Sequence, residues 1–304
     1  MRTRPLGRSG LVVSEVGFGC LPIGGGFYGP ADDAESAAAI ASALALGCTF
    51  FDTADVYGKS ERVLGAAIAG RRDAVIATKA GLASPDGHRP ERLRASLDAS
   101  LERLGLPRAA LFQLHDPPRD VLLDPKTHAF LLGLVSEKKA RAIGASVVSV
   151  ADGLAAVECG KYDAIQVEVN LLAPEAAREL LQRAKERGVG VIAKVPLDHG
   201  VLSGKYGIDA RFGPEDVRAQ APPAELAWRA RALEELSFLW GEGTGRTPAQ
   251  AALRWLLDQD GLSTVIPGVK TASQAEEAMG ASDVSPLSAD ERARVDSLQR
   301  RGWR

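Results

Sequence analysis

The chain has 304 residues, of which 45% are hydrophobic and 25% charged, and its formal net charge at pH 7 is −2. This is ordinary globular composition, and a charge so close to zero gives no electrostatic reason to expect a nucleic acid or an anionic membrane as a partner. The chain has no apolar run of about eighteen residues that could span a membrane, and its first residues lack the apolar core of a signal peptide.

Short apolar runs alternate with amphipathic stretches along the chain, which is the pattern of repeated strand–helix units. A hairpin comes first, from residues 2–6 and 11–13 around a glycine turn. Eight strands are predicted after it, at residues 15–19, 49–52, 74–79, 110–115, 140–146, 164–169, 190–195 and 263–267. Helices are predicted at residues 33–46, 60–69, 90–104, 125–138, 150–158, 174–187, 224–241, 248–258, 271–279 and 287–301.

Eight strand–helix units with short connections predict a closed parallel (β/α)8 TIM barrel, and the absence of a linker predicts that residues 1–304 form a single domain. The hairpin strands cannot join such a barrel in sequence order, so we expect them to plug its amino-terminal end. The helix at 287–301 would be an extra element after the barrel has closed. The one long connection, from residue 197 to about 223, is typical of a functional lid or a disordered segment.

The cysteines and histidines give no sign of a metal site. The three cysteines, Cys20, Cys48 and Cys159, lack the spacing of metal ligands and indicate reduced thiols. The four histidines are scattered and form no zinc motif. We therefore expect a cytoplasmic protein whose chemistry needs no metal ion.

Four polar residues stand where predicted strands end. Asp52, Lys79 and His115 each close an apolar run, and Tyr57 follows Asp52 by five positions. The carboxyl ends of parallel strands meet at one rim, which is where TIM barrels carry their active sites. A carboxylate, a phenol, an ammonium and an imidazole that converge there can form a proton-transfer site, although each alone is more often a solvated or structural group.

The sequences around these four residues resemble the active-site motifs of the aldo-keto reductases. The motifs are FDTADVYG, IATKAG and FQLHDP, and the resemblance extends from the opening RPLGRSGLVVSEVGFG to IPGVKTASQAEE near the end. The opening and the HDP sequence are similar to the branch that contains bacterial aldose and fucose dehydrogenases and pyridoxal reductases. The resemblance implies an NADP(H)-dependent oxidoreductase in which Tyr57 is the proton donor and Asp52, Lys79 and His115 assist it.

These four residue types can together protonate a carbonyl oxygen that receives a hydride. A free tyrosine has a pKa of about 10, and a neighbouring ammonium favours the phenolate, so we expect Lys79 to lower the pKa of Tyr57. Asp52 would pair with the ammonium and hold it, and His115 would donate a hydrogen bond that orients the substrate oxygen. In the plain structural interpretation, Asp52 and Lys79 are only a strand-end ion pair and Tyr57 is a loop aromatic.

A hydride needs a carrier, and two segments are typical of a nucleotide site. No G-x-G-x-x-G sequence opens a helix after the first strand, which argues against a Rossmann domain. PLDHGVLSGKYG and IPGVKTASQAEE instead follow the seventh and eighth strands, where TIM barrels commonly bind phosphate. By resemblance, NADP(H) would be held by Ser146, Gln166, Pro196, Leu197, Leu202, Gly204, Lys205, Gly268, Lys270, Thr271, Gln274 and Glu277, with Asn170 close by. Within this set Lys270 would meet the 2′-phosphate, and Ser146 and Gln166 the nicotinamide.

The chain departs from the family pattern beside the expected cofactor. Val147 and Ala278 stand where asparagines are common, and Lys194 stands where a stacking aromatic is usual. A lysine cannot stack on the nicotinamide, and an unpaired ammonium beside its cationic oxidised ring is costly. Either Lys194 points under the ring and favours the reduced cofactor, or it pairs with a neighbouring carboxylate or faces the diphosphate.

The expected substrate is a small carbonyl compound or a sugar, bound between loops with Phe27, Tyr28 and Trp228 as candidate apolar walls. A helical tryptophan such as Trp228 is more often part of a core. No nucleic acid or membrane partner is expected, and the chain would be a monomer or a weak homo-oligomer. Two alternatives belong to other classes: a nucleotide-binding regulatory protein with little turnover, and a Schiff-base lyase that uses Lys79 or Lys194.

Overall fold

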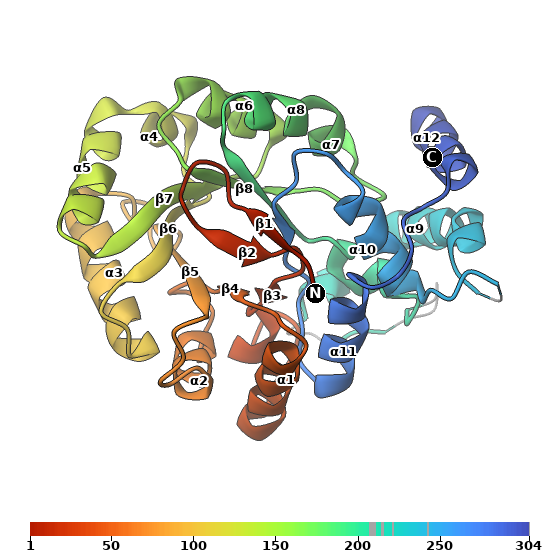
Figure 1. The fold of residues 1–304 in the computed structure, drawn as a ribbon, viewed down its shortest axis with the longest axis horizontal. Coiled ribbons are helices and arrows are strands. Elements are labelled where there is room, and N and C mark those ends of the chain that lie inside the picture. Colours follow the sequence, from red (N-terminus) through yellow and green to blue (C-terminus); the bar gives the residue numbers. More distant parts are fainter. Residues whose placement is uncertain (207–210, 214–215, 221, 242, 304) are drawn as a thin grey trace.

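Eight parallel strands form the centre of this computed structural model, which describes residues 1–206, 211–213, 216–220, 222–241 and 243–303 (Figure 1). Their order in the sheet is β3-β4-β5-β6-β7-β8-β9-β10, so each strand lies beside its neighbour in the chain. The strands are β3 (Phe18–Gly19), β4 (Phe50–Asp52), β5 (Val75–Ala80), β6 (Ala109–His115), β7 (Ala140–Ser146), β8 (Ala164–Glu168), β9 (Gly190–Lys194) and β10 (Thr264–Val265). All eight strands lie at the positions that the sequence predicts.

The sheet closes on itself through its first and last strands. Val16 pairs with Val265 in a parallel bridge. The Gly17 N–H donates to the Val265 carbonyl over 2.8 Å, and the Val265 N–H donates to the Glu15 carbonyl over 3.0 Å. The result is the predicted (β/α)8 barrel, in which strand side chains are buried on both faces of the sheet.

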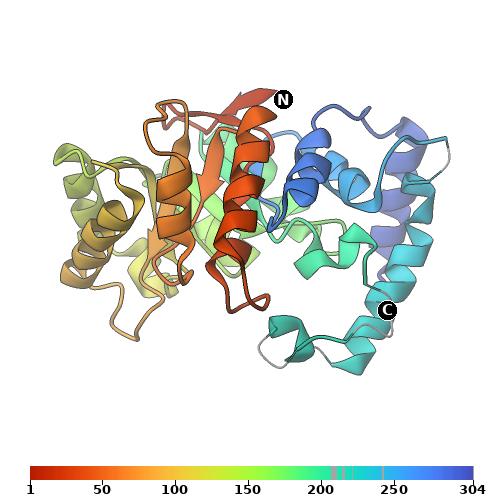
Figure 2. The same ribbon diagram turned by 90° about the horizontal axis from the view of Figure 1, so that it is seen from below.

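Helices cover the outside of the barrel, as Figures 1 and 2 show. They are α1 (Asp33–Ala45), α2 (Ser60–Ala67), α3 (Pro90–Leu104), α4 (Arg119–Leu123), α5 (Pro125–Ser136), α6 (Val150–Cys159), α7 (Glu175–Glu179), α8 (Leu181–Glu186), α9 (Pro223–Glu235), α10 (Pro248–Leu257), α11 (Ala272–Gly280) and α12 (Ala289–Arg301). The last of these is the expected extra helix. Every helix within the described residues is too short or too polar to span a bilayer.

The helices differ from the prediction in four places. The helix expected at residues 224–241 ends at Glu235 as α9, and a short turn, η4 (Ser237–Leu239), follows it. The helix expected at residues 174–187 is divided at Leu180 into α7 and α8, although Leu180 keeps helical backbone angles. The sequence does not predict α4, which is only five residues long. The long connection after β9 contains the short turns η2 (Asp198–Ser203) and η3 (Val217–Gln220), and part of it lies outside the described residues.

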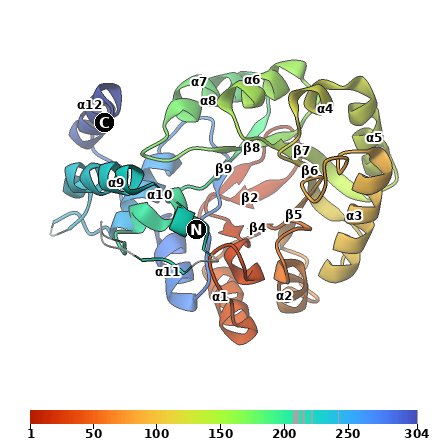
Figure 3. The same ribbon diagram turned by 180° about the vertical axis from the view of Figure 1, so that it is seen from behind.

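The N-terminal hairpin, β1 (Thr3–Pro5) with β2 (Val12–Ser14), closes the amino-terminal end of the barrel as expected. It lies across the barrel in Figure 1 and at the upper end of the molecule in Figure 2. Leu6, Leu11 and Val13 are buried in one cluster with side chains from inside the barrel, among them Phe50 and Leu111. The opposite, carboxyl-terminal end of the strands faces the viewer in Figure 3.

Candidate functional site

A buried ion pair lies at the carboxyl-terminal end of the strands. The Lys79 ammonium donates to Asp52 Oδ1 over 2.5 Å and to the Thr53 carbonyl over 2.8 Å. The second Asp52 oxygen accepts from Gln113 Nε2 (2.9 Å) and Gln166 Nε2 (2.8 Å). Burial alone would lower the pKa of Lys79, but the Asp52 carboxylate and the Tyr57 phenol together outweigh burial and raise that pKa. The ammonium therefore stays charged and fixed in position.

Tyr57 lies directly beside this ion pair. The Lys79 ammonium is 4.8 Å from the centre of the Tyr57 ring, and that ring meets the His115 imidazole edge to face, with 5.7 Å between ring centres. Burial raises the pKa of Tyr57, and the charge of Lys79 offsets this only in part. The expectation that Lys79 brings the pKa of Tyr57 below its ordinary value is therefore wrong, because desolvation of the phenolate outweighs the attraction of the ammonium.

His115 is buried beside Tyr57 and is neutral at ordinary pH. Burial, reinforced by the charge of Lys79, lowers the pKa of its imidazole to about 3. Nδ1 of His115 has no hydrogen-bond partner among the described residues. A neutral imidazole keeps one N–H, which can donate to an oxygen atom bound next to Tyr57.

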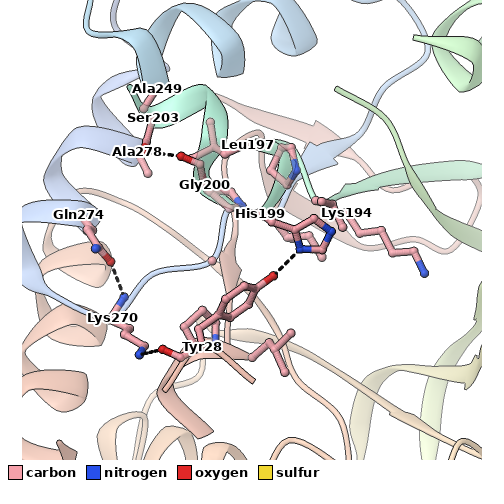
Figure 4. A pocket seen from close by; sticks show the side chains of 18 of the residues that line it. Tyr28, Lys194, Leu197, His199, Gly200, Ser203, Ala249, Lys270, Gln274 and Ala278 are labelled. Atoms are coloured by element: carbon pink, nitrogen blue, oxygen red, sulfur yellow. Dashed lines mark hydrogen bonds between the residues drawn. The ribbon is translucent and has the colours of Figure 1, made fainter. Parts of the chain in front are cut away.

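A cavity of about 300 Å³ is lined by Tyr57 and by the loops that follow β9 and β10. Figure 4 shows part of its wall, with Lys194, Leu197 and Lys270 labelled. The predicted site residues in its wall are Asp52, Tyr57, Gln166, Pro196, Leu197, Lys205, Gly268, Lys270, Gln274 and Glu277. The other predicted residues are not in the wall: Lys79, His115, Ser146, Leu202, Gly204 and Thr271. Asp52 and Tyr57 thus line the same cavity as the two nucleotide segments, while Lys79 and His115 lie beside Tyr57, outside the wall.

Lys270 connects two loops in the wall of the cavity. Its ammonium donates to the carbonyls of Tyr28 (2.5 Å) and Pro30 (3.1 Å), and its backbone N–H donates to Gln274 Oε1 (2.8 Å). The loop after β3 is thereby fastened to the loop after β10. Lys270 has this structural role in addition to the positive charge that it brings to the cavity wall.

The remaining residues of the nucleotide segments are held by local contacts. Lys205 pairs with Glu277 over 3.6 Å, so charges of opposite sign meet in the cavity wall. Thr271 caps the first turn of α11 with its side chain. Leu202 is fully buried, and Gly204 ends η2 in the left-handed region with a φ of 71°. Leu202, Gly204 and Thr271 therefore shape the two segments from behind the wall.

Lys194, at the end of β9, is paired with a carboxylate. Its ammonium donates to Asp116 Oδ1 over 3.1 Å and to Ser146 Oγ over 3.0 Å. Lys194 lines the cavity, and Figure 4 shows it extending away from the contact between Tyr28 and His199. Of the expected positions for Lys194, the structure shows the pairing with a neighbouring carboxylate.

Several polar residues of the site were not singled out in the sequence. Gln113 precedes His115 by two positions on β6, so strand alternation could have placed both on the same face. His199 Nδ1 lies 2.8 Å from the Tyr28 hydroxyl and links the loops after β3 and β9. Arg218 lines the cavity with its guanidinium 5.3 Å from the Tyr28 ring centre. His199 and Arg218 lie in the long connection, whose path no local pattern predicts.

The three expected apolar walls lie in different surroundings. Tyr28 lines the cavity, although its hydroxyl is engaged with His199. Phe27 is 42% exposed, and its ring centre lies 6.5 Å from that of Tyr57. Trp228, on α9, packs against the core instead of lining the cavity, as its helical position favours.

The residues of this cavity fit a dinucleotide. Lys270 brings positive charge to the wall near the start of α11, and a helix N-terminus favours phosphate. Lys205 and Arg218 also line the cavity, but they are paired with Glu277 and Asp216. Gln166 supplies an amide to the same wall, where its Nε2 donates to Asp52. Among the described residues, no three histidine, cysteine, aspartate or glutamate side chains are grouped so that they could hold a metal ion.

Comparisons with known proteins cover nearly the whole chain. Residues 15–300 match the sequence model of the Aldo/keto reductase family. The chain is 34% identical to aldo-keto reductase str7 of Strobilurus tenacellus, over 97% of this chain and 91% of that protein. It is 30% identical to aldo-keto reductase yakc of Schizosaccharomyces pombe, whose name specifies NADP(+), over 92% of this chain and 86% of that protein. The structure of glycerol dehydrogenase AKR11B4 from Gluconobacter oxydans is similar, with a TM-score of 0.83, 29% identity, and coverage of 98% of this chain and 95% of that chain.

Proposed function

This chain belongs to the aldo/keto reductase family, and we propose that it transfers a hydride between NADP(H) and a small carbonyl or sugar substrate. Membership of the family makes it an oxidoreductase. The observation that carries the proposal is that one cavity is lined both by Tyr57 and by the cationic nucleotide segments around Lys205 and Lys270.

Tyr57 is the proposed proton donor in the reduction. Because burial raises its pKa, the phenol is protonated at neutral pH and has a proton to give. NADPH, when bound, supplies the hydride that converts the carbonyl group into an alkoxide. After Tyr57 has given its proton to that oxygen, the Lys79 ammonium, 4.8 Å from the ring centre, stabilises the phenolate. The ammonium therefore favours the state after proton transfer more than the resting phenol.

Asp52 and His115 hold the geometry of this step. Asp52 fixes Lys79 through the 2.5 Å contact and is itself held by two glutamine amides. His115, neutral because of its low pKa, donates a hydrogen bond to the substrate oxygen and orients it beside Tyr57. A charged imidazole next to the Lys79 ammonium would cost additional free energy, which is why the neutral form suits this position.

NADP(H) is proposed over NAD(H) because of the charge at the nucleotide end. A cation in contact with a phosphate is worth roughly 1.5–3 kcal/mol, which corresponds to about a tenfold to a hundredfold difference in affinity. Lys270 and Arg218 both line this part of the cavity. The NADP(+) in the name of the yeast relative supports the same choice.

The Schiff-base alternative lacks a suitable nucleophile among the two lysines considered for it. An amine must lose its proton before it can attack a carbonyl, but Asp52 raises the pKa of Lys79 and keeps it charged. Lys194 is held by Asp116 and by the Ser146 hydroxyl. The regulatory alternative differs from the proposal only in turnover, so a turnover measurement separates the two.

The test compares wild type with Tyr57→Phe. NADPH or NADH absorbance is followed with a panel of aldehydes, ketones and sugars, and the Kd for NADPH is titrated separately. We expect wild type to prefer NADPH, and Tyr57→Phe to lose about 10²–10⁴-fold in turnover with an unchanged Kd, since only the proton donor is removed. Tyr162→Phe is the matched control, because it makes the same substitution at another buried tyrosine, whose hydroxyl donates to the Leu122 carbonyl.

Two results would contradict the proposal. Turnover by Tyr57→Phe within about tenfold of wild type would exclude Tyr57 as the general acid. Wild type that binds NADPH tightly but oxidises it with no compound of the panel would favour the regulatory alternative.

A further inference from the structure

Another ion pair besides that of Asp52 and Lys79 lies beside Tyr57, between Lys194 in the cavity wall and Asp116 behind it. Lys194 donates to Asp116 over 3.1 Å, and the two side chains are 20% and 24% exposed. Lys194 lines the same cavity as Tyr57 and Gln166. Water screens a charge in such a place only partly, so the charge of Lys194 acts on whatever the cavity holds.

Asp116 is held by its backbone as well as by Lys194. It directly follows His115, and its φ of 46° lies in the left-handed region, which aspartate and asparagine tolerate better than most residues. Its N–H donates to the Ser146 carbonyl over 2.9 Å, and Ser146 Oγ accepts from Lys194. The ends of β6, β7 and β9 are thus joined around one pair of opposite charges.

The proposed reaction places a nicotinamide ring, whose charge changes during the reaction, beside this part of the cavity wall. A nicotinamide ring carries a positive charge when oxidised and none when reduced. The carbon that gives or takes the hydride must come within about 3–3.5 Å of a carbonyl carbon bound at Tyr57, so the ring belongs in the part of the cavity that Tyr57, Gln166 and Lys194 line. A lone ammonium there would repel the oxidised ring and leave the reduced ring unaffected.

We infer that Asp116 is the counter-ion that allows this cavity to bind the oxidised cofactor, because it cancels the charge of Lys194. The inference rests on the proposed function, since it concerns the nicotinamide cofactor. Asp116 acts through Lys194 and is therefore a positioning residue. With the pair intact, the wall treats the cationic and the neutral ring nearly alike, so neither direction of the reaction is disfavoured by this lysine.

The test is the ratio of two dissociation constants, Kd for NADP⁺ divided by Kd for NADPH, titrated by protein fluorescence at neutral pH. Asp116→Asn leaves an unpaired ammonium and should raise the ratio about tenfold, and Lys194→Met leaves an unpaired carboxylate and should lower it by a similar factor. The double variant should return to within about twofold of wild type, and added salt should shrink both shifts. Asparagine tolerates the left-handed backbone at position 116, so this substitution adds no backbone strain there.

Asp98→Asn is the matched control. It removes the partner of Lys139, 2.7 Å away, from a pair just before β7 at the other end of the barrel, and it should leave the ratio unchanged. Single variants whose ratios equal that of wild type, or shift in the same direction, overturn the inference while the proposed function stands. Wild type that binds neither form of the cofactor overturns the proposed function, and the inference with it.

Discussion

At the scale of single residues, Asp52 shows what spacing along the chain can and cannot predict. Its pairing with Lys79 follows from two apolar runs that end at one rim, and the structure has this contact. Its contacts with Gln113 and Gln166 come from β6 and β8, which are not neighbours of β4 in the sheet. Such contacts cross the interior of the barrel and depend on its curvature, which the sequence does not show.

Burial depth is the second property that the sequence does not reveal. The residues beside Tyr57 are predicted correctly, but the direction of its pKa shift is not, because the desolvation of the phenol depends on packing around it. The partner of Lys194 is likewise hidden. Asp116 stands in the recognised FQLHDP motif, yet nothing local indicates that β9 delivers a lysine to it.

His115 should make the stability of the protein depend on pH. Its pKa falls from about 6.5 in the unfolded chain to about 3 in the folded one, so between these values the unfolded chain binds more protons. This contribution to stability is complete above pH 6.5 and is lost as the pH falls towards 3. In urea unfolding at pH 7, 5 and 4, the free energy of unfolding should therefore fall less with decreasing pH for His115→Gln than for wild type.

His128→Gln is the comparison for this experiment. Burial lowers the pKa of His128 as well, and its Nε2 lies 2.9 Å from the Leu122 carbonyl, outside the cavity wall. The His128 variant should reduce the pH dependence less than the His115 variant does. Equal pH dependence in wild type and His115→Gln would mean that His115 is not held neutral.

At the scale of elements, the segment after β9 contains backbone turns that its sequence does not predict. The chain turns sharply there, with positive φ at Val195, Asp198 and His199 as well as at Gly200 and Gly204. The sequence predicts a nucleotide loop from its glycines and lysine. It does not predict the η2 turn, because three of the residues with positive φ are not glycines and carry no turn signal of their own.

Gly204→Ala should damage this segment through two effects. The alanine would have to keep a φ of 71°, and its Cβ would lie 2.9 Å from Cγ of Pro248 at the start of α10. Gly160→Ala provides the control, because Gly160 has a φ of 67° but nothing within 4 Å of the added carbon. We expect Gly160→Ala to lower the free energy of unfolding by about 1 kcal/mol.

Gly204→Ala should lower the free energy of unfolding further than that and also weaken NADPH binding, because Pro248 or the loop must move. Urea unfolding and cofactor titration of the two variants give the comparison. Equal losses in both variants, with NADPH affinity retained, would show that the contact with Pro248 imposes no constraint.

At the scale of the whole molecule, the architecture was predictable because each strand is a short apolar run between polar turns. The order of the strands follows from the right-handed crossover that joins parallel neighbours. The break at Leu180 between α7 and α8 was not predictable, and nothing in the structure explains it. Local pattern thus fixes the elements, while details of helix ends depend on packing that only the folded chain supplies.

The hairpin plug should contribute strongly to stability. Leu6 is fully buried among side chains from inside the barrel, and Leu6→Ala should lower the free energy of unfolding by about 2–5 kcal/mol because it leaves a cavity there. Val12, in the same hairpin, is 59% exposed, so Val12→Ala should cost about 0.5 kcal/mol or less. Urea unfolding measures both, and similar losses would mean that the hairpin covers the barrel without packing into it.

The contact between β3 and β10 also has a consequence for how the chain reaches this fold. The residues that close the sheet, Gly17 and Val265, are about 250 positions apart in the chain, so their meeting carries one of the largest losses of chain entropy in the molecule. During synthesis one edge of β3 therefore stays unpaired until β10 has left the ribosome. Unpaired strand edges attract other chains, so incomplete molecules are the ones most prone to aggregate.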